Sequence, residues 1–160
     1  MMKKKGQEEM VGFAVILILV AVILAVLIGF MVRKQSKSVL QSYEISSFIE
    51  SMLKYTSECE DYMGYEEVQE VILSCKRNLL CLNGKSSCEV LNSTIESMIN
   101  SSWNINPESP NTGYRLKINV DETDFLILQQ GVSLNSSYIS DSHQFVGEGN
   151  DYSVSLRIYH

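Results

Sequence analysis

The chain has 160 residues, which is enough for one domain or two very small ones. It is acidic, with a formal net charge of −6, and it has no basic stripe interleaved with aromatic residues, so we expect no nucleic-acid partner. Its two histidines, His143 and His160, are too few for most metal or hydrolase sites, and we expect neither a cofactor nor an enzymatic activity.

One long apolar segment dominates the N-terminal part of the chain. Residues 11–32 contain no charged side chain and consist almost entirely of Val, Ile, Leu, Ala, Phe, Met and Gly. As an α-helix this segment would be roughly 33 Å long, which is enough to span a bilayer core of about 30 Å. No second segment is long enough to span, which argues against a polytopic transporter or channel. A cleaved secretory signal has a shorter apolar region, so we predict a retained anchor.

The orientation of this anchor follows from the residues beyond it. Three basic residues precede the segment and three follow it, so the positive-inside rule does not decide. The downstream chain contains four cysteines and three N-x-[ST] sequons, both typical of an oxidising exterior. The sequons begin at Asn92, Asn100 and Asn135, which are candidate N-glycosylation sites. We therefore predict a single-pass membrane protein whose C-terminal domain is extracellular.

The residues before the apolar segment read Met-Met-Lys-Lys-Lys-Gly-Gln-Glu-Glu-Met-Val-Gly-Phe. This start resembles the class III signal peptide of type IV pilin-like proteins, in the archaeal form in which Gln often follows the cut. The resemblance implies a basic leader at residues 1–6 that a prepilin peptidase removes on the cytoplasmic side, between Gly6 and Gln7. The retained helix would anchor the subunit and pack in a filament core.

The resemblance has one departure. Many type IV pilins carry Glu at the fifth mature position, where it pairs with the N-terminal amine of a neighbouring subunit. Val11 occupies that position here, and the nearest carboxylates belong to Glu8 and Glu9. Either side chain is a candidate for the pairing role. The competing interpretation is a plain N-terminal anchor whose lysines set its topology.

Small residues recur on one face of the predicted membrane helix. This stripe consists of Ala14, Ala21, Ala25 and Gly29. Small residues at such spacing let a second helix approach closely, which favours helix association where no hydrophobic driving force exists. We therefore predict that this stripe packs against other subunits.

The helix continues beyond the membrane. Residues 38–54 contain neither Gly nor Pro, and their apolar residues follow a helical stripe: Leu40, Tyr43, Phe48, Ile49, Met52 and Leu53. We predict one helix over residues 7–58, with its transmembrane part at 11–32. Its amphipathic second half must lie on a folded domain.

Residues 59–103 are predicted to be a disulfide-linked helical region. Acidic residues in the first turn and basic ones in the last favour a helix over 65–78. A further helix over 87–101 is preceded by Ser86, which has capping-box spacing to Glu89.

The four cysteines, Cys59, Cys75, Cys81 and Cys88, do not fit a zinc site, because no Cys-x-x-Cys motif occurs among them. Three pairings are possible. We favour Cys59–Cys75 with Cys81–Cys88, because the latter two flank a turn-like Asn-Gly-Lys sequence.

The C-terminal part changes to strand periodicity. Both prolines lie in a linker at residues 104–113, and apolar residues then alternate with polar ones over 114–160. Strands at 114–120, 125–130, within 138–146 and at 152–158 predict a four-stranded antiparallel meander. The fold class is therefore α+β, and a long N-terminal helix followed by a C-terminal sheet resembles the type IV pilin fold.

Two functional hypotheses follow. The first is a structural subunit (pilin, minor pilin or pseudopilin) of a type IV pilus-like cell-surface filament, with other pilin-like subunits and a pilus assembly machine as partners. The alternative is a non-polymerising, membrane-anchored extracellular domain for binding or adhesion. Acidic turns at 121–124 and 148–151 offer oxygen ligands for Ca²⁺ but match no EF-hand loop. The adjacent residues Asp141, Ser142 and His143 cannot form a catalytic relay.

Overall fold

The computed structural model describes the backbone of residues 5–131 and 136–160, and the side chains of residues 12–29, 42–131 and 136–160. The chain divides into two compact units, residues 1–40 and 41–160, which are described separately. Helix α1 (Lys5–Leu53) belongs to both units, because the first unit contains its apolar part and the second contains its last turns.

The first unit is helical over its described residues. The span Gly12–Gly29 has a mean hydropathy of 3.2, and none of its residues is buried. The described region therefore has one helix that is long and apolar enough to cross a membrane, as the sequence predicts. By composition and length this helix is compatible with a single-pass anchor.

The second unit begins with the end of α1, which stops earlier than expected. The helix ends at Leu53 rather than near residue 58, and strand β1 (Thr56–Asp61) pairs antiparallel with β2 (Gly64–Glu67). The Asp61 carboxylate caps the turn between them by accepting hydrogen bonds from the backbone N–H groups of Met63 (2.7 Å) and Gly64 (3.0 Å). Gly64 has a φ of +136°, a conformation that side chains disfavour.

Two short helices follow this hairpin. Helix α2 (Val68–Lys76) is shorter than the expected 65–78, because residues 65–67 belong to β2. Helix α3 (Ser87–Trp103) begins as expected after Ser86. The Ser86 side chain makes no capping hydrogen bond, however, so the predicted capping box is wrong. The hydroxyl of Ser87 donates instead to the Leu79 carbonyl at 2.8 Å, which fixes the entry to the helix.

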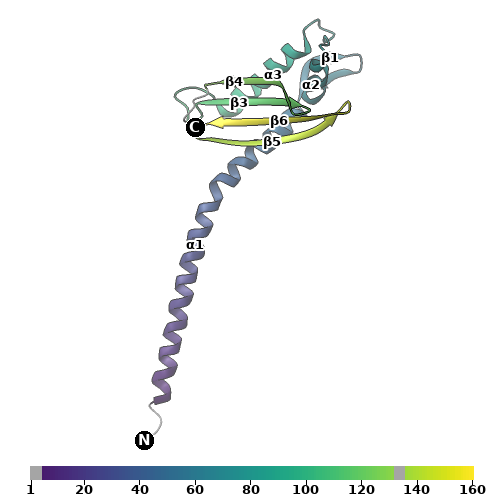
Figure 1. The fold of residues 1–160 in the computed structure, drawn as a ribbon. Helices are drawn as coiled ribbons and strands as arrows, with labels where there is room; N and C mark the ends of the chain where they lie inside the picture. Colours follow the sequence, from purple (N-terminus) through teal and green to yellow (C-terminus); the bar gives the residue numbers. More distant parts are fainter. Residues whose placement is uncertain (1–4, 132–135) are drawn as a thin grey trace. The chain divides into compact units, whose positions relative to one another are not determined.

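The C-terminal strands form one antiparallel sheet, in which β4, β3, β6 and β5 lie side by side in that order (Figure 1). The strands are β3 (Gly113–Val120), β4 (Thr123–Gln130), β5 (Tyr138–Gly147) and β6 (Asn150–Tyr159). The expected meander is therefore wrong in its order. Two hairpins lie next to each other, and β3 pairs with β6 along its whole length, from Gly113–Tyr159 to Val120–Tyr152.

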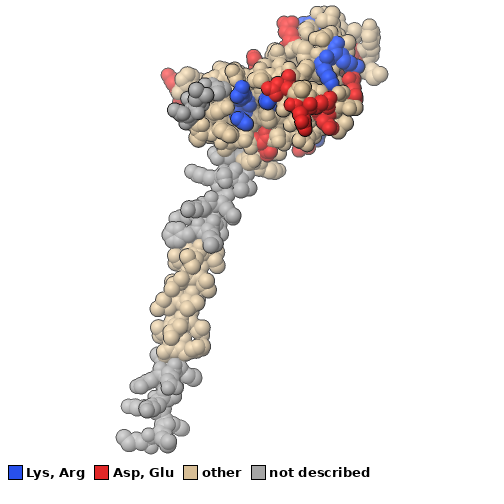
Figure 2. Space-filling view, in the orientation of Figure 1, with Lys and Arg blue, Asp and Glu red and all other residues tan. Residues whose placement is uncertain are grey.

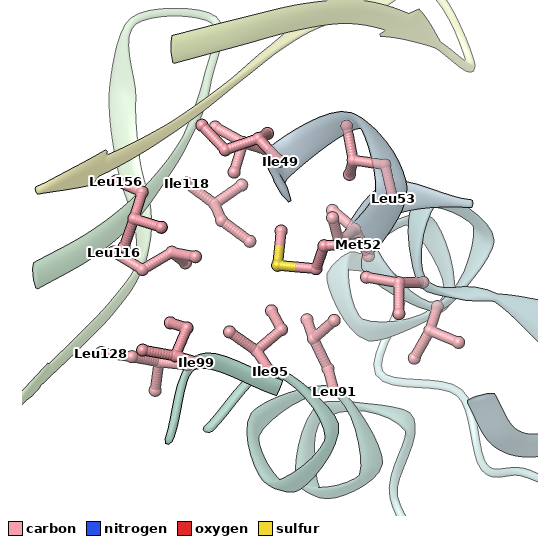
Figure 3. Packing of buried hydrophobic residues seen from close by; sticks show 14 of the residues in the cluster. Ile49, Met52, Leu53, Leu91, Ile95, Ile99, Leu116, Ile118, Leu128 and Leu156 are labelled. Atoms are coloured by element: carbon pink, nitrogen blue, oxygen red, sulfur yellow. The ribbon is translucent and has the colours of Figure 1, made fainter. Parts of the chain in front are cut away.

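The core lies on one face of this sheet. Figure 3 shows side chains from α1, α3 and the central strands meeting in one cluster, with Met52 between Ile49 and Leu91. Ile49, Met52 and Leu53 of the predicted amphipathic stripe are buried in this core, and Ile45, which was not predicted, joins them. The prediction is wrong for Tyr43, which is 71% exposed, and the side chain of Leu40 lies outside the described residues. Alternate residues of the central strands point into the same cluster: Tyr114, Leu116, Ile118, Val120, Tyr152, Val154, Leu156 and Ile158.

Candidate functional site

The exposed apolar span of α1 is the first feature that requires a functional explanation. Its large side chains are about half to two-thirds exposed, from 49% for Val20 to 66% for Phe13. Soluble monomers seldom expose a continuous apolar surface of this extent, because each buried methylene is worth about 0.8 kcal/mol. This surface must be covered by lipid, by other apolar helices, or by each in turn.

The small-residue stripe lies within this exposed span. Ala14, Ala21, Ala25 and Gly29 are all exposed in the helix. A methyl group built on Gly29 would meet no atom within 4 Å, so the described part of the chain leaves this position open to a neighbour. The stripe is thus accessible to a second helix, and its packing against one remains a prediction.

The expected leader cleavage site lies at the start of α1. Residues 5–10 belong to the helix by their backbone, which places Gly6, Gln7, Glu8 and Glu9 in its first turns. Their side chains lie outside the described residues, as do residues 1–4. The pairing role of Glu8 or Glu9 therefore stays a prediction.

The disulfides differ from the pairing that we expected. Cys59 bonds to Cys81, and Cys75 bonds to Cys88. The chain after α2 runs beside β1, where the Leu82 N–H donates to the Glu60 carbonyl at 2.8 Å. This contact places Cys81 opposite Cys59 on β1. The local Cys81–Cys88 bond is thereby excluded.

The second disulfide joins the two short helices. Cys75 lies in the last turn of α2 and Cys88 in the first turn of α3, with their Cα atoms 4.6 Å apart. Cys59, Cys75 and Cys81 are at most 4% exposed. All four cysteines are bonded, which is compatible with a structural role in an oxidising compartment.

The sequons differ in accessibility. Asn100 is exposed near the end of α3, so its side chain is open to modification. Asn92 is half-buried in the same helix, and its Oδ1 atom is buried. Asn135 lies outside the described residues. Of the two described sequons, Asn100 is therefore the more accessible to a glycosyltransferase.

One carboxyl group outside these features has an unusual environment. Glu66 on β2 lines a hollow of about 270 Å³ beside α2, and its Oε1 accepts a hydrogen bond from Ser74 at 3.0 Å. Its Oε2 is buried and has no partner among the described residues. Burial raises the pKa of Glu66, while the Ser74 hydrogen bond opposes this shift. The buried environment of Glu66 could not be predicted from the sequence, because the hairpin β1–β2 itself was not predicted.

The two acidic turns are hydrogen-bonded to each other through Asp121 and Asp151. In the turn after β3, an Asp121 carboxylate oxygen accepts the backbone N–H of Asp151 at 3.0 Å. Within the described residues, no group of three or more His, Cys, Asp or Glu side chains could hold a metal ion. On β5 the Asp141 carboxylate accepts a hydrogen bond from the Ser42 hydroxyl of α1 at 3.4 Å, whereas strand alternation points Ser142 to the opposite face. The Asp141 carboxylate therefore contributes to the contact between β5 and α1 in the domain.

Comparison with known proteins adds no family to this description. No protein-family model, no curated protein and no solved structure matches the chain.

Proposed function

We propose that the chain is a structural subunit (pilin, minor pilin or pseudopilin) of a type IV pilus-like cell-surface filament. The observation that carries the proposal is the exposed apolar span Gly12–Gly29, in a helix whose last turns are built into the core of a disulfide-bonded domain. A subunit held this way presents its apolar part to neighbours while its domain stays folded.

The same helix suits both a membrane and a filament core. Lipid tails and neighbouring apolar helices are equally apolar, so exchanging one for the other requires no large change in hydrophobic free energy. Close packing at the stripe of Ala14, Ala21, Ala25 and Gly29 would then favour helix–helix contact. The proposed partners are the membrane, copies of this chain or other pilin-like subunits, and an assembly machine that supplies the work.

Processing is the first step of the proposed pathway. Removal of residues 1–6 by a prepilin peptidase would take away three lysines and change the net charge from −6 to −9, with ten basic residues left against 19 acidic ones. The C-terminal domain would lie outside the cell, where both disulfides are stable.

The test is a Gly6→Val substitution in the native host. We expect it to block leader removal and filament formation, because a branched side chain then precedes the cut. Gly12→Val is the matched control, since a Cβ at Gly12 would meet nothing within 4 Å and processing should continue. Filaments that still form from the Gly6→Val protein would contradict the proposal.

The second candidate is an anchored binding domain that does not polymerise. It is favoured by the turn between β1 and β2, where Tyr62 and Met63 are 96% and 98% exposed and offer an apolar contact surface. Retention of the leader, together with the lack of detergent-resistant oligomers, would favour this candidate over the filament subunit.

A further inference from the structure

The sheet face opposite the core carries a cluster of cations in an otherwise acidic chain. Arg115 and Lys117 lie on β3 and Arg157 lies on β6, each alternating with core residues. Figure 2 shows Lys and Arg side chains beside Asp and Glu side chains over the region of these strands. The register places Arg115 directly opposite Arg157. Like charges directly opposite each other destabilise a sheet, so this pair requires an explanation.

Neither arginine forms a salt bridge with the residues that the structure describes. The described residues place no carboxylate within 4.0 Å of Arg115 or Arg157, whereas Lys54, Arg77, Lys85 and Lys117 each have one. The Nε atom of Arg115 is buried without a hydrogen-bond partner in this part of the chain.

The cationic groups are held in place by their neighbours. The Arg157 guanidinium lies 5.0 Å from the centre of the Tyr138 ring, in a cation–π contact. The Lys117 ammonium lies 2.6 Å from a carboxylate oxygen of Asp124, which holds it at the side of the arginine pair. Because these side chains are already held in position, less side-chain conformational entropy is lost when a ligand binds.

A hollow of about 140 Å³ lies at this cluster. It is lined by the three cations with Asp124, Ile127 and Ser155. Ser155 lies opposite Lys117 in the register, and Ile127 forms an apolar wall on the neighbouring strand. The hollow is small enough for a single anionic group, and most of its charge is positive.

We propose that this hollow is an oxyanion site in which Arg115 and Arg157 bind one carboxylate, sulfate or phosphate group. Guanidinium groups present parallel N–H donors that match the oxygens of these anions, and such charge-assisted bonds are about twice as strong as neutral ones. The bound anion neutralises the opposed pair and thereby removes the repulsion across β3 and β6. The site is independent of the proposed filament role.

The test is thermal unfolding of the full chain in detergent micelles, followed by the fluorescence of Trp103. Millimolar sulfate or phosphate is added to a low-salt chloride buffer, and sodium chloride matches the ionic strength in the reference. We expect the wild type to gain about 5 °C at an anion concentration near ten times its dissociation constant. Arg157→Gln and Arg115→Gln should each lose this gain.

Lys85→Gln is the matched control, because Lys85 pairs with Glu58 and lies outside strands β3–β6. This variant should keep the full gain. An equal gain in the wild type and in Arg157→Gln would show a general salt effect and overturn the proposal, as would no gain in the wild type.

A dilution series identifies the source of the anion. If a carboxylate of a second copy fills the site, the wild-type melting temperature without added anion falls on dilution and that of Arg157→Gln does not. If it is constant, the site takes a free oxyanion. Both results support the site, provided that Arg157→Gln abolishes the gain.

Discussion

The substitution Ile49→Ala tests whether the last turns of α1 belong to the core of the domain. Ile49 has no exposed surface and lies in the cluster where α1, α3 and the central strands meet. Its removal leaves a cavity that the surrounding β-sheet and helices can fill only in part. Buried Ile-to-Ala changes cost about 2–5 kcal/mol, and the full burial of Ile49 favours about 3–4 kcal/mol.

The assay is urea unfolding of the full chain in detergent micelles with both disulfides intact. Trp103 reports directly on this region, because its ring centre lies 4.5 Å from that of Phe48 on α1. With a urea dependence of about 1.5–2 kcal/mol per M, the midpoint should fall by roughly 2 M.

Ile16→Ala is the matched control in the same helix. Ile16 is 61% exposed, so the same change there should leave the free energy of unfolding of the domain within about 0.5 kcal/mol of the wild type. Equal effects of the two substitutions, or no effect of Ile49→Ala, would refute the division of α1 into an exposed apolar part and a core part.

Two further predictions concern the disulfide pairing and the environment of Glu66, neither of which the sequence analysis predicted correctly. In a tryptic digest without reduction, peptide 55–76 should be disulfide-linked both to the peptide that contains Cys81 and to the peptide that contains Cys88. A bond within peptide 55–76 would contradict the structure. A second digest with a glutamate-specific protease then assigns each bond to its cysteine. The raised pKa of Glu66 means that the folded state keeps a proton which the unfolded chain has released, so stability should fall as the pH rises above about 4.5. Glu66→Gln should flatten this slope in urea midpoints measured from about pH 4 to pH 7, and an unchanged slope would assign it to other groups.

The elements that depend on local periodicity could be predicted from the sequence. The strand alternation from residue 114 is confirmed, because its apolar residues share one buried face. The helical stripe is confirmed at Ile49 and Met52 but not at Tyr43, which is exposed. The hairpin β1–β2 could not be predicted in this way. Its strands are short and polar, and it depends on the Asp61 turn and on contacts with the chain after α2.

Features that require distant parts of the chain to meet were predicted less well. The pairing of β3 with β6 joins residues about 40 positions apart, so alternation within each strand gave no information about strand order. The predicted cysteine pairing was wrong for the same reason. Cys59 lies next to Cys81 because the chain after α2 packs beside strand β1 of the hairpin, which was not predicted. The opposition of Arg115 and Arg157 likewise becomes visible only in the register of the sheet.

The most direct test of the proposed filament role is the N-terminal residue of the protein isolated from native membranes, measured by mass spectrometry. Our account predicts that the mature chain starts at Gln7, with the glutamine intact or cyclised to pyroglutamate. A chain that starts at Met1 or Met2 would contradict prepilin-type processing, and the anchored binding domain would then be the better interpretation.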